Sequence, residues 1–362
     1  MTNLPRIRVT ETAGLRRFLY PLTAIIQLTD DVDFRKISLQ KQSGTAVPLQ
    51  VEHIAARRST LVGYPSENYN VHFAVSLAPH ETVELSFVEG VPEIVPDRLN
   101  VTYKDGDLTN TQQRLRIEIG QKELLRSVIY DGIEHLRSPV RIERSGDSLS
   151  PNIWSATADF EATIAASLGI SGSYSDGVTG QTKTEITACK SWATVNHRTT
   201  NLPPDETITF TLPFAVTNEK IVTDFGTGNG TYAQISAEDG NEIVWRGEQS
   251  EAGWSWQLSV NGRLDYVGSL LPHELASRNW LHVIDGDKSI AVAVVSTLEG
   301  ISALETRITG NGDIITTFHT DGSKREKRRF AVCYHFLNAL PPIAAATNPH
   351  SILEPPHVEV VH

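Results

Sequence analysis

Asn-Gly and Asp-Gly pairs recur along the sequence after residue 100, and no other feature limits the possible folds as strongly. Both pairs adopt positive φ angles with little strain, so they favour the type I′ turns that join neighbouring antiparallel strands. The pairs are Asp105-Gly106, Asp131-Gly132, Asp176-Gly177, Asn229-Gly230, Asp239-Gly240, Asn261-Gly262, Asp285-Gly286, Asn311-Gly312 and Asp321-Gly322. One such pair arises by chance, but this series predicts an antiparallel meander.

The segments between these turns alternate apolar and polar residues, which is typical of a half-buried strand. Examples are Leu115, Ile117 and Ile119; Ile208, Phe210, Leu212 and Phe214; and, near the N-terminus, Val71, Phe73, Val75 and Leu77. The continuous apolar run 290–295 predicts a central strand that is buried on both faces. No segment keeps a period of 3.6 residues for more than a turn or two, so we expect an all-β protein.

A stretch with two prolines and a glycine, residues 90–97, divides the chain into two parts. We expect residues 1–95 to form a small β-barrel or sandwich. Residues 96–340 are expected to form a large antiparallel β-super-sandwich. The last segment, 341–362, holds five prolines, and we expect it to run extended over the surface and to dock there through its apolar residues.

Composition narrows the classes of function. The formal net charge is −11 and the isoelectric point is about 5.6, which argues against nucleic acid as the main partner. No run approaches the roughly 20 apolar residues that cross a bilayer, so no membrane partner is expected. The N-terminus lacks the apolar core of a signal peptide, and only Cys189 and Cys333 are present. These observations predict a cytoplasmic protein.

The N-terminal sequence resembles the exo-rhamnogalacturonan lyase / YetA-like proteins. The residues that carry the resemblance are Gly14, Arg16, Arg17 and Pro21, together with the later run 77–82, Leu-Ala-Pro-His-Glu-Thr. The resemblance implies a small first barrel and a central β-sandwich related to the galactose-mutarotase-like super-sandwiches. It also implies sugar chemistry. That family has an α/α-toroid domain that helps to build its active cleft, and this sequence shows no helical repeat.

Arg278, Trp280 and His282 form the strongest candidate site. On a strand, alternate residues share one face, so a cation, an aromatic ring and an imidazole would lie along one stripe. Histidine titrates near neutral pH and suits acid–base work. The arrangement also fits a hydrogen-bonded structural histidine beside a core tryptophan, and both interpretations stay open.

Three further groups are candidates. Tyr130, Glu134 and His135 flank the turn at Asp131-Gly132 and offer either a functional edge or an exposed polar loop. Trp254 and Trp256 share a face and fit either a platform for a sugar ring or core packing. His197, Arg198 and Tyr334 complete the set, and alternation turns His197 and Arg198 to opposite faces. It likewise turns Tyr334 and His335 apart, so only one of them can line a cleft.

These residues suit two reactions. A lyase acting on a uronate needs a cation that neutralises the carboxylate, a base that takes a proton and an acid that protonates the leaving oxygen. The cation could be Arg278 or Arg198. The base could be His282 or His197, and the acid could be Tyr130 or Tyr334. A glycoside hydrolase needs two carboxylates at a defined separation, which sequence does not give. The charge run Lys324–Arg329 fits either a solvated hairpin arm or the binding of an acidic polysaccharide.

We therefore expect a carbohydrate-active protein, a lyase or a glycoside hydrolase, that acts on an oligosaccharide in a cleft of the large sandwich. The alternative is a non-catalytic carbohydrate-binding or assembly subunit whose site another chain completes. No cofactor is expected, and no metal site, because no metal-ligating spacing of histidines and cysteines occurs. Assembly into a homo-oligomer stays open.

Overall fold

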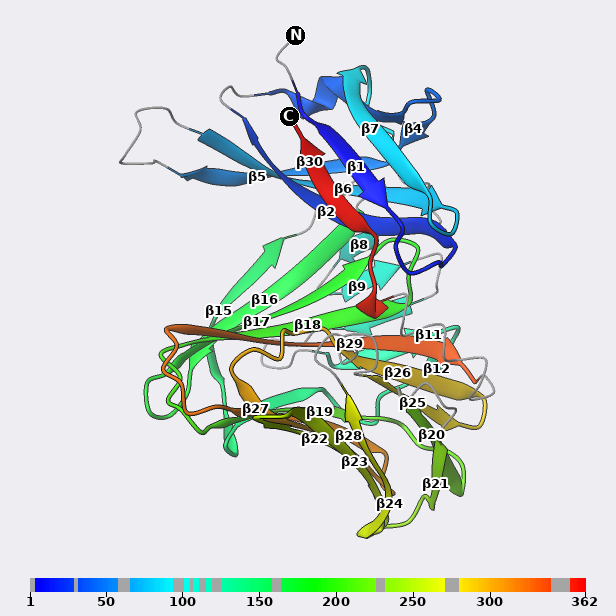
Figure 1. Cartoon of the computed structure of the whole chain (residues 1–362), viewed down its shortest axis with the longest axis vertical. Coiled ribbons are helices and arrows are strands. Elements are labelled where there is room, and N and C mark those ends of the chain that lie inside the picture. Colours follow the sequence, from blue (N-terminus) through cyan, green and yellow to red (C-terminus); the bar gives the residue numbers. More distant parts are fainter. Residues whose placement is uncertain are drawn as a thin grey trace.

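The computed structural model consists almost entirely of strands, as expected. It describes residues 4–28, 32–57, 66–93, 101–104, 107–110, 115–118, 125–157, 164–225, 232–270, 280–339 and 352–362. Within these ranges the strands form antiparallel sheets, and no helix is long and apolar enough to span a membrane. The strand-rich lower part and the smaller N-terminal part lie one above the other in Figure 1.

The N-terminal part consists of two sheets around one apolar core. One sheet has the order β30-β1-β7-β3-β4 and the other has the order β2-β6-β5. Their strands are β1 (Arg6–Thr10), β2 (Arg17–Leu28), β3 (Ile37–Lys41), β4 (Ala46–Val47), β5 (Leu49–Arg57), β6 (Ser66–Leu77), β7 (Thr82–Glu89) and β30 (His357–Val361), with a short 3-10 helix at Phe34–Lys36. Val71, Phe73, Val75 and Leu77 are all buried, so their predicted shared face is confirmed.

The last strand of the chain belongs to the first sheet. β30 pairs antiparallel with β1, from Arg6 opposite Val361 to Thr10 opposite His357. Figure 1 shows it beside β1, next to the N-terminus. Residues 357–361 of the segment expected to run extended therefore form an edge strand of the N-terminal part.

The large part is a sandwich of a nine-stranded and an eight-stranded sheet. The nine-stranded sheet contains, in spatial order, β15 (Ser150–Thr157), β16 (Ala165–Ser173), β17 (Thr179–Thr187), β18 (Trp192–Thr200), β29 (Lys327–Asn338), β26 (Lys288–Val294), β25 (Trp280–Asp285), β20 (Lys220–Phe225) and β21 (Tyr232–Ser236). The eight-stranded sheet contains β14 (Asp147–Ser148), β13 (Arg141–Arg144), β19 (Thr207–Pro213), β28 (Asp313–Thr320), β27 (Ile301–Thr309), β22 (Glu242–Ser250), β23 (Gly253–Val260) and β24 (Arg263–Leu270). A small sheet, β8 (Val101–Lys104), β9 (Asp107–Asn110), β10 (Leu115–Glu118), β11 (Ser127–Tyr130) and β12 (Ile133–Glu134), adjoins them.

Alternation places the core between these two large sheets. Ile208, Phe210, Leu212 and Phe214 are fully buried there, and β26 is buried along its whole length between β25 and β29. Both expectations from the sequence pattern are confirmed. Because β26 has strands on both sides and cover on both faces, it needs apolar residues at consecutive positions.

The hairpin turns follow the sequence signals. Asp131-Gly132 and Asn261-Gly262 have positive φ at both residues (51° and 82°, 49° and 73°), as a type I′ turn requires. Each joins two strands that pair directly. Ser145-Gly146 has the same backbone (45° and 84°) although serine gives a weaker signal. The pairs Asp105-Gly106 and Asn229-Gly230 lie outside the described residues.

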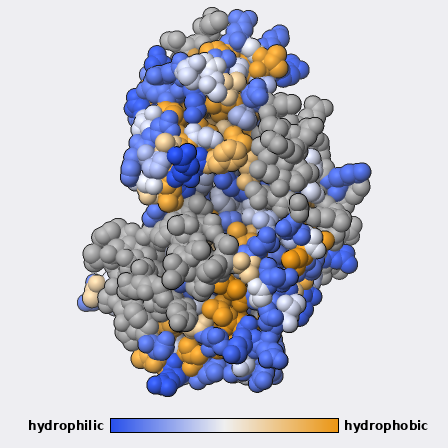
Figure 2. All heavy atoms as spheres, turned by 90° about the vertical axis from the view of Figure 1, so that its right-hand side faces the viewer, coloured by the Kyte–Doolittle hydropathy of each residue, from blue (hydrophilic) through white to orange (hydrophobic). Residues whose placement is uncertain are grey.

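The N-terminal part packs on the nine-stranded sheet. Trp192 and Cys333, which belong to that sheet, are members of the N-terminal apolar cluster. The rings of Tyr20 and Trp192 lie 5.9 Å apart, and Lys190 donates a hydrogen bond to the carbonyl of Phe18 (3.1 Å). Figure 2 shows the two parts from the side, with hydrophilic residues over most of the described surface.

A buried ion pair in the N-terminal part links the beginning of the chain to the segment just before β30. Arg17 and Glu11 are almost fully buried and their N–O distance is 2.9 Å. Arg17 also donates to the carbonyl of Glu354, three residues before β30 begins. Burial would raise the pKa of Glu11, but the hydrogen bonds from Arg17 and from backbone amides lower it below its ordinary value.

Arg17→Met is expected to destabilise the protein by about 3–5 kcal/mol, because it leaves the Glu11 carboxylate buried without its counter-charge. Urea unfolding at pH 7 measures the change. Arg8→Met is the matched control, since Arg8 pairs with Glu84 at the surface of the other N-terminal sheet and surface pairs contribute little. Equal losses in the two variants would contradict the importance of the buried pair.

Candidate functional site

The nine-stranded sheet has two faces with different surroundings. One set of alternate residues, such as Ile170, Val195 and Val332, packs against the eight-stranded sheet. The other set points away from the sandwich, and we call this side the outer face. The N-terminal part covers the outer face at Trp192 and Cys333. Side chains further along the same strands, toward the start of β29, remain exposed.

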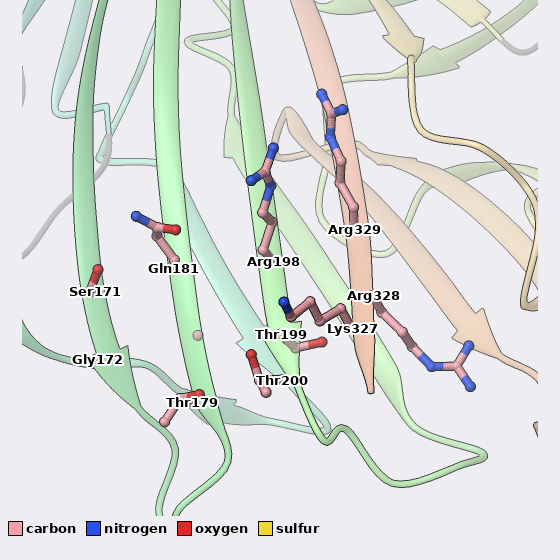
Figure 3. A pocket seen from close by; sticks show the side chains of 11 residues that line it. Ser171, Gly172, Thr179, Gln181, Arg198, Thr199, Thr200, Lys327, Arg328 and Arg329 are labelled. Carbon is pink, nitrogen blue, oxygen red and sulfur yellow. The ribbon is translucent and has the colours of Figure 1, made fainter. Parts of the chain in front are cut away.

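Two polar rows cross this exposed area. Antiparallel pairing places Ser171, Gln181, Arg198 and Arg329 opposite one another on β16, β17, β18 and β29. The next outward row contains Thr179, Thr200 and Lys327. These seven residues line a cavity of about 660 Å³, which we call the basic groove (Figure 3). The groove offers cations, hydroxyls and one amide, and no carboxylate is among the described residues that line it.

Arg198 and Arg329 concentrate positive charge in the groove. They occupy directly opposite positions on β18 and β29, where like charges repel. Arg329 donates two hydrogen bonds to the Asn196 side chain (3.0 and 2.5 Å), which is neutral. Burial lowers the pKa of Arg329, the charge of Arg198 lowers it further, and Glu185 opposes both effects. In the described part of the chain, no carboxylate forms an ion pair with Arg198, Arg329 or Lys327.

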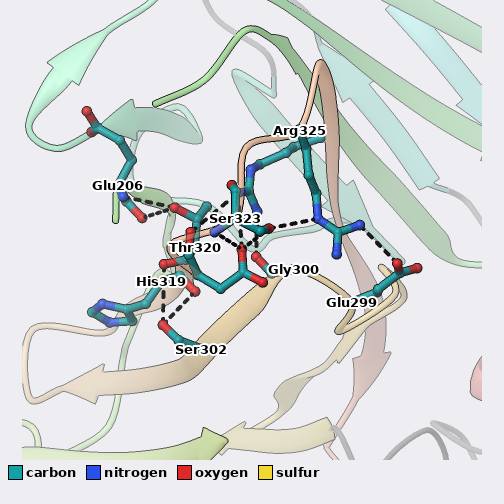
Figure 4. Close-up of polar contacts among 10 residues, drawn as sticks. Glu206, Glu299, Gly300, Ser302, His319, Thr320, Ser323 and Arg325 are labelled. Carbon is teal, nitrogen blue, oxygen red and sulfur yellow. Dashed lines mark hydrogen bonds and ion pairs between the residues drawn. The ribbon is translucent and has the colours of Figure 1, made fainter. Parts of the chain in front are cut away.

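The segment that leads into β29 is held by its own basic residues. Arg328 turns away from the groove and donates to the carbonyls of Gly300 and Ser323 (2.5 Å each). Arg325 binds Glu299 (2.9 Å) and the hydroxyl of Ser323, as Figure 4 shows. The run Lys324–Arg329 is therefore neither wholly a solvated arm nor wholly a binding surface. Arg325 and Arg328 stabilise the loop, while Lys327 and Arg329 face the groove.

Trp280 and His282 share the outer face, as alternation along β25 predicts, but both are buried. No described residue is a hydrogen-bond partner of either ring nitrogen of His282, and burial lowers its pKa to about 4. It is therefore neutral near pH 7 and lies away from any described open cleft. Arg278 lies outside the described residues. The catalytic role of His282 stays a prediction.

Asp224 and His335, which were not among the candidates from the sequence, lie level with His282 on nearby strands of the outer face. Asp224 is directly opposite His282 on β20, and His335 lies two strands away on β29. Burial raises the pKa of Asp224 to about 6 and lowers that of His335 to about 3. Alternation along the strand indicated that either Tyr334 or His335 faces outward. The pairing of β29 with β18 and β26, which are far from it in sequence, places His335 on the outer face.

Tyr334 was predicted to contact substrate, and the structure places it away from the basic groove. Its side chain is fully buried in the sandwich core, because alternation along β29 turns it away from the outer face. His197 is turned inward in the same way. It is fully buried between Tyr174 (2.8 Å) and Thr182 (2.7 Å), and burial lowers its pKa to about 4. Arg198, next to it, is the member of this group that reaches solvent.

Tyr130, Glu134 and His135 do not form an open functional edge. Glu134 accepts hydrogen bonds from the amides of Val128 and Leu136 (2.9 Å each), so it fastens the hairpin. His135 is fully buried, with its ring nitrogens near two backbone carbonyls. Burial lowers the pKa of His135. Tyr130 packs its ring near that of His135, 6.0 Å away.

Trp254 and Trp256 are not an exposed sugar platform. They lie in the sandwich core with exposed fractions of 5% and 1%, stacked in a series with Trp245 at ring distances of 5.0 and 6.1 Å. Gly247 lies opposite Trp256 and leaves room for its ring, since a Cβ there would lie 2.8 Å from it. Their shared face was predicted, but that face points inward.

No group of three or more His, Cys, Asp or Glu side chains that could hold a metal ion occurs among the described residues. The catalytic candidates are also dispersed. His197 and Tyr334 lie in the sandwich core, His135 lies beside the small sheet, and His282 lies on the outer face.

The fold resembles parts of known glycoside hydrolases. One is an alpha-mannosidase from Enterococcus faecalis V583, with a TM-score of 0.63 and 10% identity over 99% of this chain and 46% of that one. Another is a protein of glycosyl hydrolase family 38 from Enterococcus faecalis, with a TM-score of 0.62 and 11% identity over 99% of this chain and 47% of that one. This chain therefore spans less than half the length of either protein. No family profile and no curated protein matches the sequence.

His197 should make stability depend on pH. Its pKa falls from 6.5 in the unfolded chain to about 4 in the folded one, so below pH 6.5 the unfolded chain binds a proton that the folded chain does not. The stability it contributes is complete above pH 6.5 and is lost as the pH falls toward 4, by about 1.4 kcal/mol per pH unit. Urea unfolding at pH 7, 6 and 5 should show a smaller acid loss in His197→Gln. His357→Gln is the control on an exposed edge strand, and an unchanged slope in His197→Gln would refute the assignment.

Trp256→Ala is expected to cost about 3–5 kcal/mol of folding stability, because it leaves a cavity in the sandwich core. Saccharide binding per folded molecule should stay the same. Thermal unfolding and calorimetric titration on one preparation separate the two effects. A folded variant that keeps its stability and loses binding would restore the platform interpretation.

Proposed function

We propose that this protein is a carbohydrate-binding component of a glycoside-hydrolase-type assembly, and that it holds an oligosaccharide in the basic groove. The main support for this proposal is the similarity of the fold to parts of glycoside hydrolases. Almost the whole chain aligns with less than half of an alpha-mannosidase and of a protein of glycosyl hydrolase family 38, both from Enterococcus faecalis. The catalytic groups would then come from another part of the assembly.

The groove supports binding more than catalysis. Glycoside hydrolysis needs two carboxylates that flank the bond, and none is among the described residues that line the groove. Lyase chemistry needs a base within reach of a carbon-bound proton. The nearest histidine along the chain, His197, points into the core on the opposite face of β18. Hydroxyl, amide and guanidinium groups in two rows can instead hold and orient sugar hydroxyls.

A second candidate function is catalysis by this chain itself. Asp224 and His282 favour it, because they are directly opposite each other on the outer face and their pKa values of about 6 and about 4 are both shifted by burial. In this interpretation the chain is a lyase or a hydrolase, and the resemblance to the exo-rhamnogalacturonan lyase family remains the argument for the lyase.

Binding and turnover should separate the two candidates. We expect saturable binding of at least one oligosaccharide from a panel that includes α-linked manno-oligosaccharides, and no release of products by the chain alone. Isothermal titration calorimetry and chromatography of the same mixtures provide the two measurements. Product release that disappears in Asp224→Asn and His282→Gln would overturn the binding role in favour of catalysis.

A further inference from the structure

The strongest unexplained feature of the molecule is uncompensated positive charge in a hollow of an acidic protein. The chain has 43 acidic and 32 basic residues, and several basic side chains of its sheets have two carboxylate partners. Arg144 pairs with Asp176 and Glu206, and Arg246 pairs with Glu248 and Glu305. Arg198, Lys327 and Arg329 have no such partner among the described residues.

The register of the sheet sets these three cations side by side. Arg198 faces Arg329 across one strand pair, and Lys327 lies two residues before Arg329 on the same side of β29. Figure 3 shows the Arg198 and Arg329 side chains extending in the same direction. Like charges at directly opposite positions destabilise a sheet. An anion placed between them would remove this repulsion.

The nearest charges along the sheet leave the groove positive. Lys183 and Glu185 follow Gln181 on the outer side of β17 and pair with each other at 3.6 Å. Both influence the pKa of His72, which belongs to the N-terminal part. Lys183 and Glu185 therefore lie near the N-terminal part. Their charges cancel, and the excess of three cations at Arg198, Lys327 and Arg329 remains.

The rest of the groove matches the hydroxyl groups of a sugar chain. Gln181 is beside Arg198, and Thr179 and Thr200 are beside Lys327, all on the outer face. Four strands about 4.8 Å apart give a polar surface about 14 Å wide, which is enough for several sugar units. None of the described residues that line the groove has an aromatic or purely aliphatic side chain, so polar contacts and charge supply the recognition in this proposal.

We propose that the basic groove selects oligosaccharides that carry acidic groups, with Arg198 and Arg329 binding a carboxylate, sulfate or phosphate and Lys327 binding a neighbouring anionic group. A guanidinium presents paired N–H donors that match two oxygens of an oxyanion. This inference rests on the proposed carbohydrate-binding function and adds the class of ligand to it.

Calorimetric titration with size-matched ligands tests the selectivity. The ligands are maltotetraose, tetragalacturonate, a sulfated tetrasaccharide prepared from heparin, and inorganic sulfate. We expect an acidic tetrasaccharide to bind at least tenfold more tightly than maltotetraose and more tightly than sulfate alone. The comparison of the carboxylated with the sulfated ligand identifies the anionic group. Affinity should fall as salt rises from 50 to 500 mM, since exposed charges are screened.

Two variants locate the site. Arg198→Gln and Lys327→Gln should each weaken binding of the acidic ligand by roughly tenfold or more, because each loses a charge-assisted hydrogen bond. Neither should change the weak binding of maltotetraose as strongly. Arg141→Gln removes an equally exposed cation from β13 in the other large sheet and should leave all affinities unchanged. Thermal unfolding confirms that the variants are folded.

The outcomes distinguish this inference from the function on which it rests. If neutral and acidic saccharides bind equally and Arg198→Gln has no effect, the acidic selectivity is wrong while carbohydrate binding stands. If no saccharide binds, both fail. If inorganic sulfate or a 12-nucleotide single-stranded DNA binds more tightly than every saccharide, the groove serves another class of anion and the inference is overturned.

Discussion

Burial of the nine-stranded sheet on both faces is the constraint on which the rest of the structure depends. One face packs against the eight-stranded sheet. The shared core contains Phe330 and Phe336 of the nine-stranded sheet and Phe210 of the eight-stranded sheet. The other face contacts the N-terminal part through Trp192 and Cys333. A sheet covered on both sides needs apolar residues at consecutive positions, which explains the uninterrupted run in β26. Further along the outer face, at the basic groove, the side chains are exposed and polar.

The outer face has two regions of interest. Where it is buried, titratable groups lose their hydration, so the pKa values of His282 and His335 are lowered and that of Asp224 is raised. Toward the start of β29, Arg198 and Lys327 are exposed to solvent. The outer face therefore has a buried row of titratable groups near the middle of the sheet and an exposed cationic groove near the start of β29.

The N-terminal part depends on both ends of the chain. β30 completes its first sheet beside β1, and Arg17 links Glu11 to the backbone just before β30. The C-terminal strand shields the edge of β1, which would otherwise expose unpaired backbone groups. The part that lies against the outer face is thus formed from segments more than 300 residues apart, which makes its position a property of the complete chain.

The period of the strands, many of the turns and the pairs of residues that share a face follow from the amino-acid sequence alone. The sequence predicted that Trp280 accompanies His282, that His197 opposes Arg198, and that Tyr334 opposes His335, because strand alternation is a local property. Which face is covered and which strands are neighbours depends on tertiary contacts. Arg198 and Arg329 are 131 positions apart, yet pairing of β18 with β29 places them opposite each other. The same long-range pairing turns Trp256 and Tyr334 into the core, since a two-residue period does not say which side of a sheet meets water.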